Sequence, residues 1–147
     1  MTSDGISEKD WDKVQKLAEN LVDANYKEDE NFQKETLENI FKYLEKLEEK
    51  YGQKPSIIST KADFLFDDND KRIELYKNAY YLAKKINDNY NKVEISDSLT
   101  DLYIEVIGSY KDAKYWFNIL SKEMKENTEY LDKEKLDKYN IQIKKLK

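Results

Sequence analysis

Histidine and cysteine are both absent from this chain of 147 residues. Without them the chain has no disulfide, no thiolate nucleophile, no zinc cluster and no histidine general base. Its three glycines, Gly5, Gly52 and Gly108, are too far apart to build a phosphate-binding loop. Only carboxylates, lysines and tyrosines remain for catalysis, so we expect a protein that is not an enzyme and that carries no cofactor.

Two acidic clusters could in principle bind a hard cation through oxygen atoms. They are Glu45, Glu48 and Glu49, and Asp67, Asp68 and Asp70. The second cluster lacks the spacing of a calcium loop, because it has no glycine at its sixth position and no closing glutamate at its twelfth. Capping of a following helix explains it better. We therefore expect no metal site.

Long apolar runs are also absent. No stretch approaches the ~20 apolar residues that a membrane-spanning helix needs, and residues 1–9 lack the apolar centre of a signal peptide. The expectation is a cytoplasmic protein that does not associate with membranes.

Charged residues make up 39% of the chain, a value that alone could indicate disorder. Aromatic residues make up 13%, however, which is far above a disordered composition and provides material for a core. The chain has a single proline and many lysines, glutamates and leucines, which favour helix. We predict one all-helical domain spanning residues 1–147.

An apolar pattern recurs along the chain. Its first copy is Leu37, Ile40, Phe41, Leu44, Leu47 and Tyr51, and 39 positions later come Tyr76, Ala79, Tyr80, Ala83, Ile86 and Tyr90. A weaker third copy, 41 positions further on, contains Phe117, Leu120 and Met124. Each copy forms one face of an amphipathic helix, and a second helical pattern precedes it. Such repeats predict a short α-solenoid of about three antiparallel helical hairpins with a C-terminal capping helix.

Local signals predict where several helices begin and end. Ser7 and Ser109 can cap the first turns of two helices, and Pro55 suits the first turn of a third. Gly52 is a natural end for the helix before it. A last helix from about Lys133 would cover the open end of the repeat. The count of helices predicted in this way is seven.

Residues 107–113, with the sequence IGSYKDA, resemble the turn of a tetratricopeptide repeat, in which the glycine frees a tight bend and the alanine lets two helices approach. Phe117 stands where that family has a large packing residue. Two departures are Leu120, in place of a small residue, and Thr100, in place of a leucine in the first helix. The resemblance implies a tetratricopeptide-like array in which the first helix of each hairpin lines a concave groove.

The register implied by this resemblance places Lys61, Phe64, Leu65, Ser98, Leu102, Glu105 and Val106 near the groove. Asp63, Asp97, Asp101 and Glu105 would make its wall acidic, although the same acids also suit an ordinary solvated face. Tyr81, Tyr103 and Tyr115 lie off the apolar stripes and could contact a partner, because tyrosine is common in binding hot spots. The candidate partner-binding residues are Lys61, Asp63, Phe64, Tyr81, Asp97, Ser98, Asp101, Leu102, Tyr103, Glu105 and Tyr115.

The segments 62–76 and 98–105 are similar to small helical-repeat immunity proteins encoded beside bacterial contact-dependent or Rhs-type toxins. Proteins of that kind neutralise a toxin by binding it. The resemblance implies an immunity protein that binds one cognate toxin tightly and occludes its active site. The alternative is a tetratricopeptide-like adaptor that recognises a peptide or a helix of a partner protein.

The distribution of charge bears on the kind of partner. The net charge is −5, but residues 133–147 hold six lysines against two acids, so the rest of the chain is more acidic still. An acidic body disfavours nucleic acid and suits a basic protein such as a basic toxin domain. The simpler alternative is that the excess of acid only improves solubility.

Overall fold

A computed structural model describes residues 1–146, and these residues form seven α-helices and no strand, which confirms the predicted all-helical class. The helices are α1 (Glu8–Tyr26), α2 (Glu30–Tyr51), α3 (Pro55–Asp63), α4 (Asn69–Lys85), α5 (Asn89–Leu102), α6 (Tyr110–Glu126) and α7 (Lys133–Lys144). A π-helical turn, η1 (Tyr103–Ile107), continues α5, and a 3₁₀ turn, η2 (Thr128–Tyr130), precedes α7. None of the helices within residues 1–146 is both long and apolar enough to cross a membrane.

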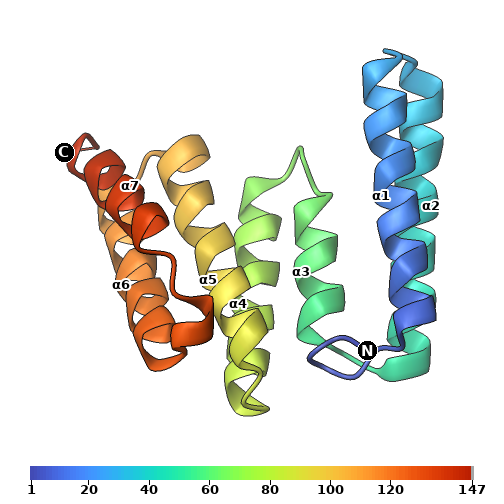
Figure 1. The fold of residues 1–147 in the computed structure, drawn as a ribbon. Coiled ribbons are helices and arrows are strands. Elements are labelled where there is room, and N and C mark those ends of the chain that lie inside the picture. The colour runs from blue at the N-terminus through green and yellow to red at the C-terminus, as the bar shows by residue number, and fades with distance from the viewer. Residues whose placement is uncertain (147) are drawn as a thin grey trace.

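Each helix packs mainly against the helices before and after it in the chain. Figure 1 shows the resulting row, with the α1–α2 hairpin at one end and α7 beside α6 at the other. The helix α3 also touches α5, so the two helices that begin successive hairpins are neighbours.

The predicted helix ends are confirmed. The Ser7 and Ser109 hydroxyl oxygens accept the backbone N–H groups of residues 10 and 112, at 3.2 and 3.3 Å. Gly52 ends α2 with a φ of 80°, and its N–H donates to the carbonyl of residue 48 at 2.8 Å. Pro55 occupies the first turn of α3, and α7 begins at Lys133.

The recurring apolar positions lie on α2, α4 and α6 and face the interior. Two sets of equivalent residues, Ile40, Ala79 and Leu120, and Leu44, Ala83 and Met124, are each at most 2% exposed. The recurrence ends earlier in the second copy, where Ile86 is 47% exposed and Tyr90 already belongs to α5. The reason is that α4 has 17 residues and α2 has 22, so the chain turns sooner.

The buried apolar side chains form two separate clusters. The N-terminal core contains Ile6, Val14, Leu21, Ile40, Leu44, Leu47 and Ile57. The C-terminal core extends from Ile58 to Ile143 and has Trp116 as its largest fully buried side chain. The helix α3 belongs to both, because Ile57 faces the N-terminal core and the adjacent Ile58 faces the C-terminal core.

The residues before α1 connect the region of the N-terminal core to the region of the C-terminal core. Ile6 is completely buried in the N-terminal core. The Asp4 carboxylate, only 6% exposed, accepts the Ser56 backbone N–H at 2.7 Å and a side-chain N–H of Asn91 at 3.4 Å. Lys54, at the start of α3, makes no capping hydrogen bond of its own. Asp4 therefore caps α3 from a distant part of the chain and links it to the start of α5.

Candidate partner-binding groove

A groove with a volume of about 800 Å³ is lined by α1, α3 and α5, the helices that begin the three hairpins. Four lining residues on each helix stand out: Glu8, Trp11, Asp12 and Gln15 on α1, Ser56, Ser59, Thr60 and Asp63 on α3, and Asn91, Glu94, Ile95 and Ser98 on α5. Residues 1–3, Tyr90 and Tyr130 complete the lining. Within each helix the four residues stand at positions i, i+3, i+4 and i+7, so they share one face. The spacing within the three sets is the same, whereas the sets themselves are 48 and 35 positions apart.

The groove is acidic. Glu8, Asp12, Asp63 and Glu94 contribute four carboxylates to its lining, which includes no lysine or arginine. Charges of one sign gathered in a concave, partly desolvated surface focus the electrostatic field there. The groove therefore attracts cations.

Asp63, the last residue of α3, lies where the surrounding helices partly exclude water. Although the residue is exposed as a whole, desolvation of its carboxyl is the main cause that raises the pKa of Asp63 to about 6. A hydrogen bond from the Tyr76 hydroxyl and the positive charge of Arg72 oppose this increase in the pKa, while the charge of Glu94 adds to it. The Asp63 carboxylate is charged at neutral pH and becomes protonated in mild acid.

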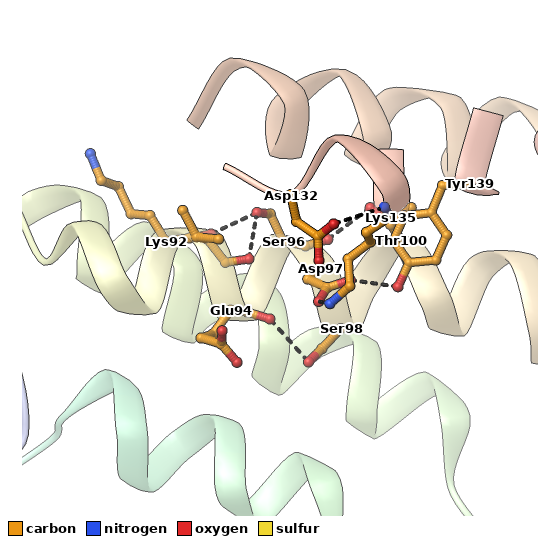
Figure 2. A network of polar contacts seen from close by, with 10 residues as sticks. Lys92, Glu94, Ser96, Asp97, Ser98, Thr100, Asp132, Lys135 and Tyr139 are labelled. Atoms are coloured by element: carbon orange, nitrogen blue, oxygen red, sulfur yellow. Dashed lines mark hydrogen bonds and ion pairs between the residues drawn. The ribbon is translucent and has the colours of Figure 1, made fainter. Parts of the chain in front are cut away.

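Asp97 and Glu94 lie one turn apart on α5 and have different roles. The Asp97 carboxylate accepts hydrogen bonds from the Lys135 ammonium and the Tyr139 hydroxyl, both at 2.5 Å. Figure 2 shows these contacts to α7, with Glu94 and Ser98 pointing away from that helix. Asp97 thus fastens α7 to α5, and Lys135 balances its charge. Glu94 forms no ion pair within residues 1–146, and burial followed by the charge of Asp97 raises the pKa of Glu94.

Three aromatic side chains accompany the carboxylates. Trp11, Tyr90 and Tyr130 all line the groove, and the rings of Tyr90 and Tyr130 meet edge to face with centroids 5.8 Å apart. The side chain of Tyr90 is 45% exposed, so part of the ring is accessible. Aromatic faces beside carboxylates suit the long cationic side chains of lysine and arginine.

The structure separates the residues that the sequence predicted for partner binding. Asp63 and Ser98 line the groove. Asp101 on α5 and Glu105 on η1 are exposed and lie outside the groove lining, and the Glu105 carboxylate accepts a hydrogen bond from the Gln142 side chain of α7 at 2.8 Å. Burial, Glu105 and Asp97 raise the pKa of Asp101.

Four other predicted residues lie elsewhere. The Lys61 ammonium pairs with Glu48 of α2 at 2.7 Å, and Phe64 packs against the N-terminal core. Leu102 and Tyr103 are only 3% and 4% exposed, so they belong to the C-terminal core and offer no surface to a partner. The reason is that α5 packs against α3, α4 and α6 and is hydrogen-bonded to α7. These contacts bury more than one face of α5.

Tyr81 and Tyr115 are exposed on a different surface, a hollow of about 590 Å³ formed by α4 and α6. The hollow shares no residue with the groove. Of the three tyrosines predicted from the sequence, Tyr103 is therefore buried, and Tyr81 and Tyr115 are exposed outside the acidic groove.

The groove also contains residues that were not predicted from the sequence. These are Glu8, Trp11, Asp12, Gln15, Glu94, Tyr90 and Tyr130. A signal was present in the largely polar stripes at i, i+3, i+4 and i+7 of the first helices. The register implied by the tetratricopeptide resemblance selected other positions of these helices.

The described residues, 1–146, include no group of three or more carboxylates placed to hold a metal ion. In the acidic cluster before α4, Asp68 caps the helix by accepting the backbone N–H of Lys71 at 3.0 Å. A scan against protein-family models matches no family, and searches of the curated proteins and of the solved structures find no significant match.

Proposed function

We propose that this protein is a noncatalytic binding module, built as a short tetratricopeptide-like α-solenoid, that holds a basic protein partner in its acidic groove. The observation that carries the proposal is the composition of the groove, with four carboxylates, three aromatic rings and no lysine or arginine. The matching spacing of the lining residues on α1, α3 and α5 supports the repeat architecture, and so do the equivalent buried positions of α2, α4 and α6.

In this proposal the charged residues speed up association and the aromatic residues supply contact area. The carboxylates steer a basic partner towards the groove and accelerate its association, an effect that salt weakens. Trp11, Tyr90 and Tyr130 then supply contact area at a small cost in side-chain entropy. Lysine or arginine side chains of the partner fit between these rings and Glu8, Asp12, Asp63 and Glu94.

The specific form of the proposal is an immunity protein that neutralises one bacterial toxin by covering its active site. A toxin that acts on an anionic substrate needs a basic surface to bind it. An acidic groove competes for that surface, and Asp101 adds a further exposed carboxylate near the end of α5. Tight binding would block the substrate without any chemistry by the immunity protein.

The second candidate is an adaptor that recognises a linear basic segment. The observation that favours it is the repetition of one four-residue stripe on three neighbouring helices. A segment that crosses those helices would meet side chains at the same spacing on each one, including at least one carboxylate per helix.

The test begins with capture of partners at low salt from the native organism and identification of what co-elutes. The groove is then altered by Asp12→Lys together with Glu94→Lys. The matched control is Glu19→Lys together with Glu38→Lys, which changes the net charge equally at exposed positions outside the groove. We expect the groove variant to bind at least about tenfold more weakly at low salt and the control to bind as the unaltered protein does.

Equal affinity of the groove variant and the unaltered protein at low salt would contradict the proposal. The immunity protein and the adaptor differ in the number of partners that each should bind. One stoichiometric partner, toxic when produced alone and harmless together with this protein, supports the immunity protein. Several weak partners that share a short basic segment support the adaptor.

A further inference from the structure

The hollow between α4 and α6 has an aromatic floor and walls. Tyr81 on α4 and Tyr115 on α6 are 50% and 55% exposed, whereas Trp116 beneath them is 2% exposed. Tyr115 meets Trp116 edge to face with ring centroids 5.5 Å apart, and Trp116 meets Tyr80 in the same way at 5.3 Å. Tyr80 in turn meets Tyr81 at 5.5 Å.

This continuous set of edge-to-face contacts holds the two exposed rings against the C-terminal core. Burial and the neighbouring Tyr115 hydroxyl raise the pKa of Tyr81, which is consistent with the two tyrosines lying close together. Exposed rings that are already fixed lose little entropy when a partner binds. The hollow therefore has the properties of a preorganised binding surface.

The charges around these rings are positive. Lys77, Lys111 and Lys114 line the hollow. The Lys114 ammonium donates to the Tyr110 hydroxyl at 3.3 Å. None of the three lysines forms an ion pair in the part of the chain that the structure describes. The acidic residue in the lining is Asp112, whose carboxylate accepts the Ser109 hydroxyl at 2.8 Å in the first turn of α6. On a protein with a net charge of −5, this surface is a local exception.

We propose that the hollow between α4 and α6 is a second binding site, which takes an acidic segment of another protein. Carboxylates of the segment pair with Lys77, Lys111 and Lys114, and its apolar parts pack on Tyr81 and Tyr115. The site is independent of the groove, because it has opposite charge and uses different helices. The protein can therefore hold a basic partner and an acidic partner at the same time.

Single-stranded nucleic acid also combines negative charge with flat rings that stack on tyrosine. Binding of that kind needs a positively charged track along which the phosphates can run. The hollow offers three lysines, and the groove on α1, α3 and α5 is acidic. A compact acidic segment of a protein fits this limited charge better than a nucleic-acid strand does.

The two tryptophans of the chain report separately on the two sites, because Trp11 lines the groove and Trp116 lies beneath the hollow. Their indole N–H signals can be followed by NMR and assigned with Trp11→Phe. At low salt we expect polyglutamate to shift the Trp116 signal in a saturable way and to leave the Trp11 signal in place. If Trp116 does not respond, or if a single-stranded thymidine oligonucleotide binds there more tightly than polyglutamate, the proposal is overturned.

Two variants locate the effect. Tyr81→Ser with Tyr115→Ser should weaken polyglutamate binding at least about tenfold. Tyr26→Ser should leave the binding unchanged, because Tyr26 is 91% exposed and lies outside both the hollow and the groove. Lys111→Glu with Lys114→Glu leaves the rings in place and should weaken binding by a similar factor. Unchanged affinity in this lysine variant would also overturn the proposal. A failed groove test would leave the Trp116 result unaffected, because that result depends on polyglutamate alone.

Discussion

The α1–α2 hairpin and the five helices that follow it are stabilised to different degrees. Among the described residues, the N-terminal core has seven buried apolar side chains and the C-terminal core has eighteen. The hairpin contacts the rest of the chain mainly through α3 and through the segment before α1. The five-helix part is instead enclosed by successive helix pairs and by the contacts of α7. Because stability follows burial, the hairpin should open more easily than the rest.

This difference matters because the groove lies across the boundary between the two parts. α1 belongs to the hairpin, whereas α5 belongs to the five-helix part, and α3 joins the two cores. A partner in the groove therefore contacts both parts and stabilises the position of the hairpin. The partner's affinity depends in turn on how firmly the hairpin is held.

Trp116→Ala should produce the largest loss of stability, because it removes the largest fully buried side chain of the C-terminal core. We expect the free energy of unfolding to fall by about 3–5 kcal/mol. Urea denaturation followed by circular dichroism measures the change. Tyr26→Ala, at a residue that is 91% exposed, is the control and should change the free energy by less than about 0.5 kcal/mol. A loss below about 1 kcal/mol for Trp116→Ala would show that the C-terminal core is not packed around this ring.

Leu44→Ala and Leu99→Ala form a matched pair, since both leucines are completely buried and lie in different cores. Each substitution should cost about 2–5 kcal/mol in its own region. Amide hydrogen exchange should show Leu44→Ala lowering protection in α1 and α2 alone. Leu99→Ala should lower protection throughout α3 to α7 and in the hairpin as well, because the hairpin depends on α3. Equal loss of protection across the chain for both variants would mean that the two cores unfold as one unit.

Asp4→Ala should release the link between the two parts. The substitution leaves the Ser56 N–H at the start of α3 without its acceptor, which costs about 1–3 kcal/mol when the donor stays buried. We expect faster amide exchange in the first turn of α3 and weaker binding in the groove. Asp23→Ala on the exposed side of α1 serves as the control. Unchanged exchange at Ser56 would mean that Asp4 does not cap α3.

The helix ends were predictable because their causes are local. Ser7 and Ser109 each accept a bond from the residue three positions further on, and Gly52 and Pro55 act through their own backbone angles. Signals of this kind need no knowledge of the tertiary structure.

The groove was less predictable, because its register depends on helix lengths. The first hairpin pairs helices of 19 and 22 residues and the second pairs helices of 9 and 17, so the first helices do not recur at the period of the second helices. The register of the tetratricopeptide resemblance places Lys61 and Leu102 at the groove, whereas the structure lines it with Thr60 and Glu94. The capping role of Asp4 could not be predicted from the sequence, because its partners Ser56 and Asn91 are 52 and 87 positions away.

The smallest expected effect is a pH dependence that originates at Asp63, where the two parts meet at the groove. The pKa of Asp63 is about 6 in the folded protein, against an ordinary value of 3.8. The folded state therefore binds a proton more readily than the unfolded state, and the free energy of unfolding should decrease as the pH rises from about 4 to about 6. Water reaches this residue, so we expect a decrease of no more than about 1 kcal/mol.

Asp63→Asn should make this decrease smaller and leave the part that originates at Glu94 and Asp101, whose pKa values burial also raises. Urea denaturation of both proteins across the same pH range would show the difference. Glu19→Gln, at an exposed position of α1, is the matched control and should keep the decrease. The same protonation removes one of the four groove carboxylates, so a basic partner should bind more weakly below pH 6 to the unaltered protein and with less change to the Asp63→Asn protein. If the asparagine variant retains the full dependence of stability on pH, the titrating group lies elsewhere in the chain and Asp63 does not sense protons at the boundary between the two cores.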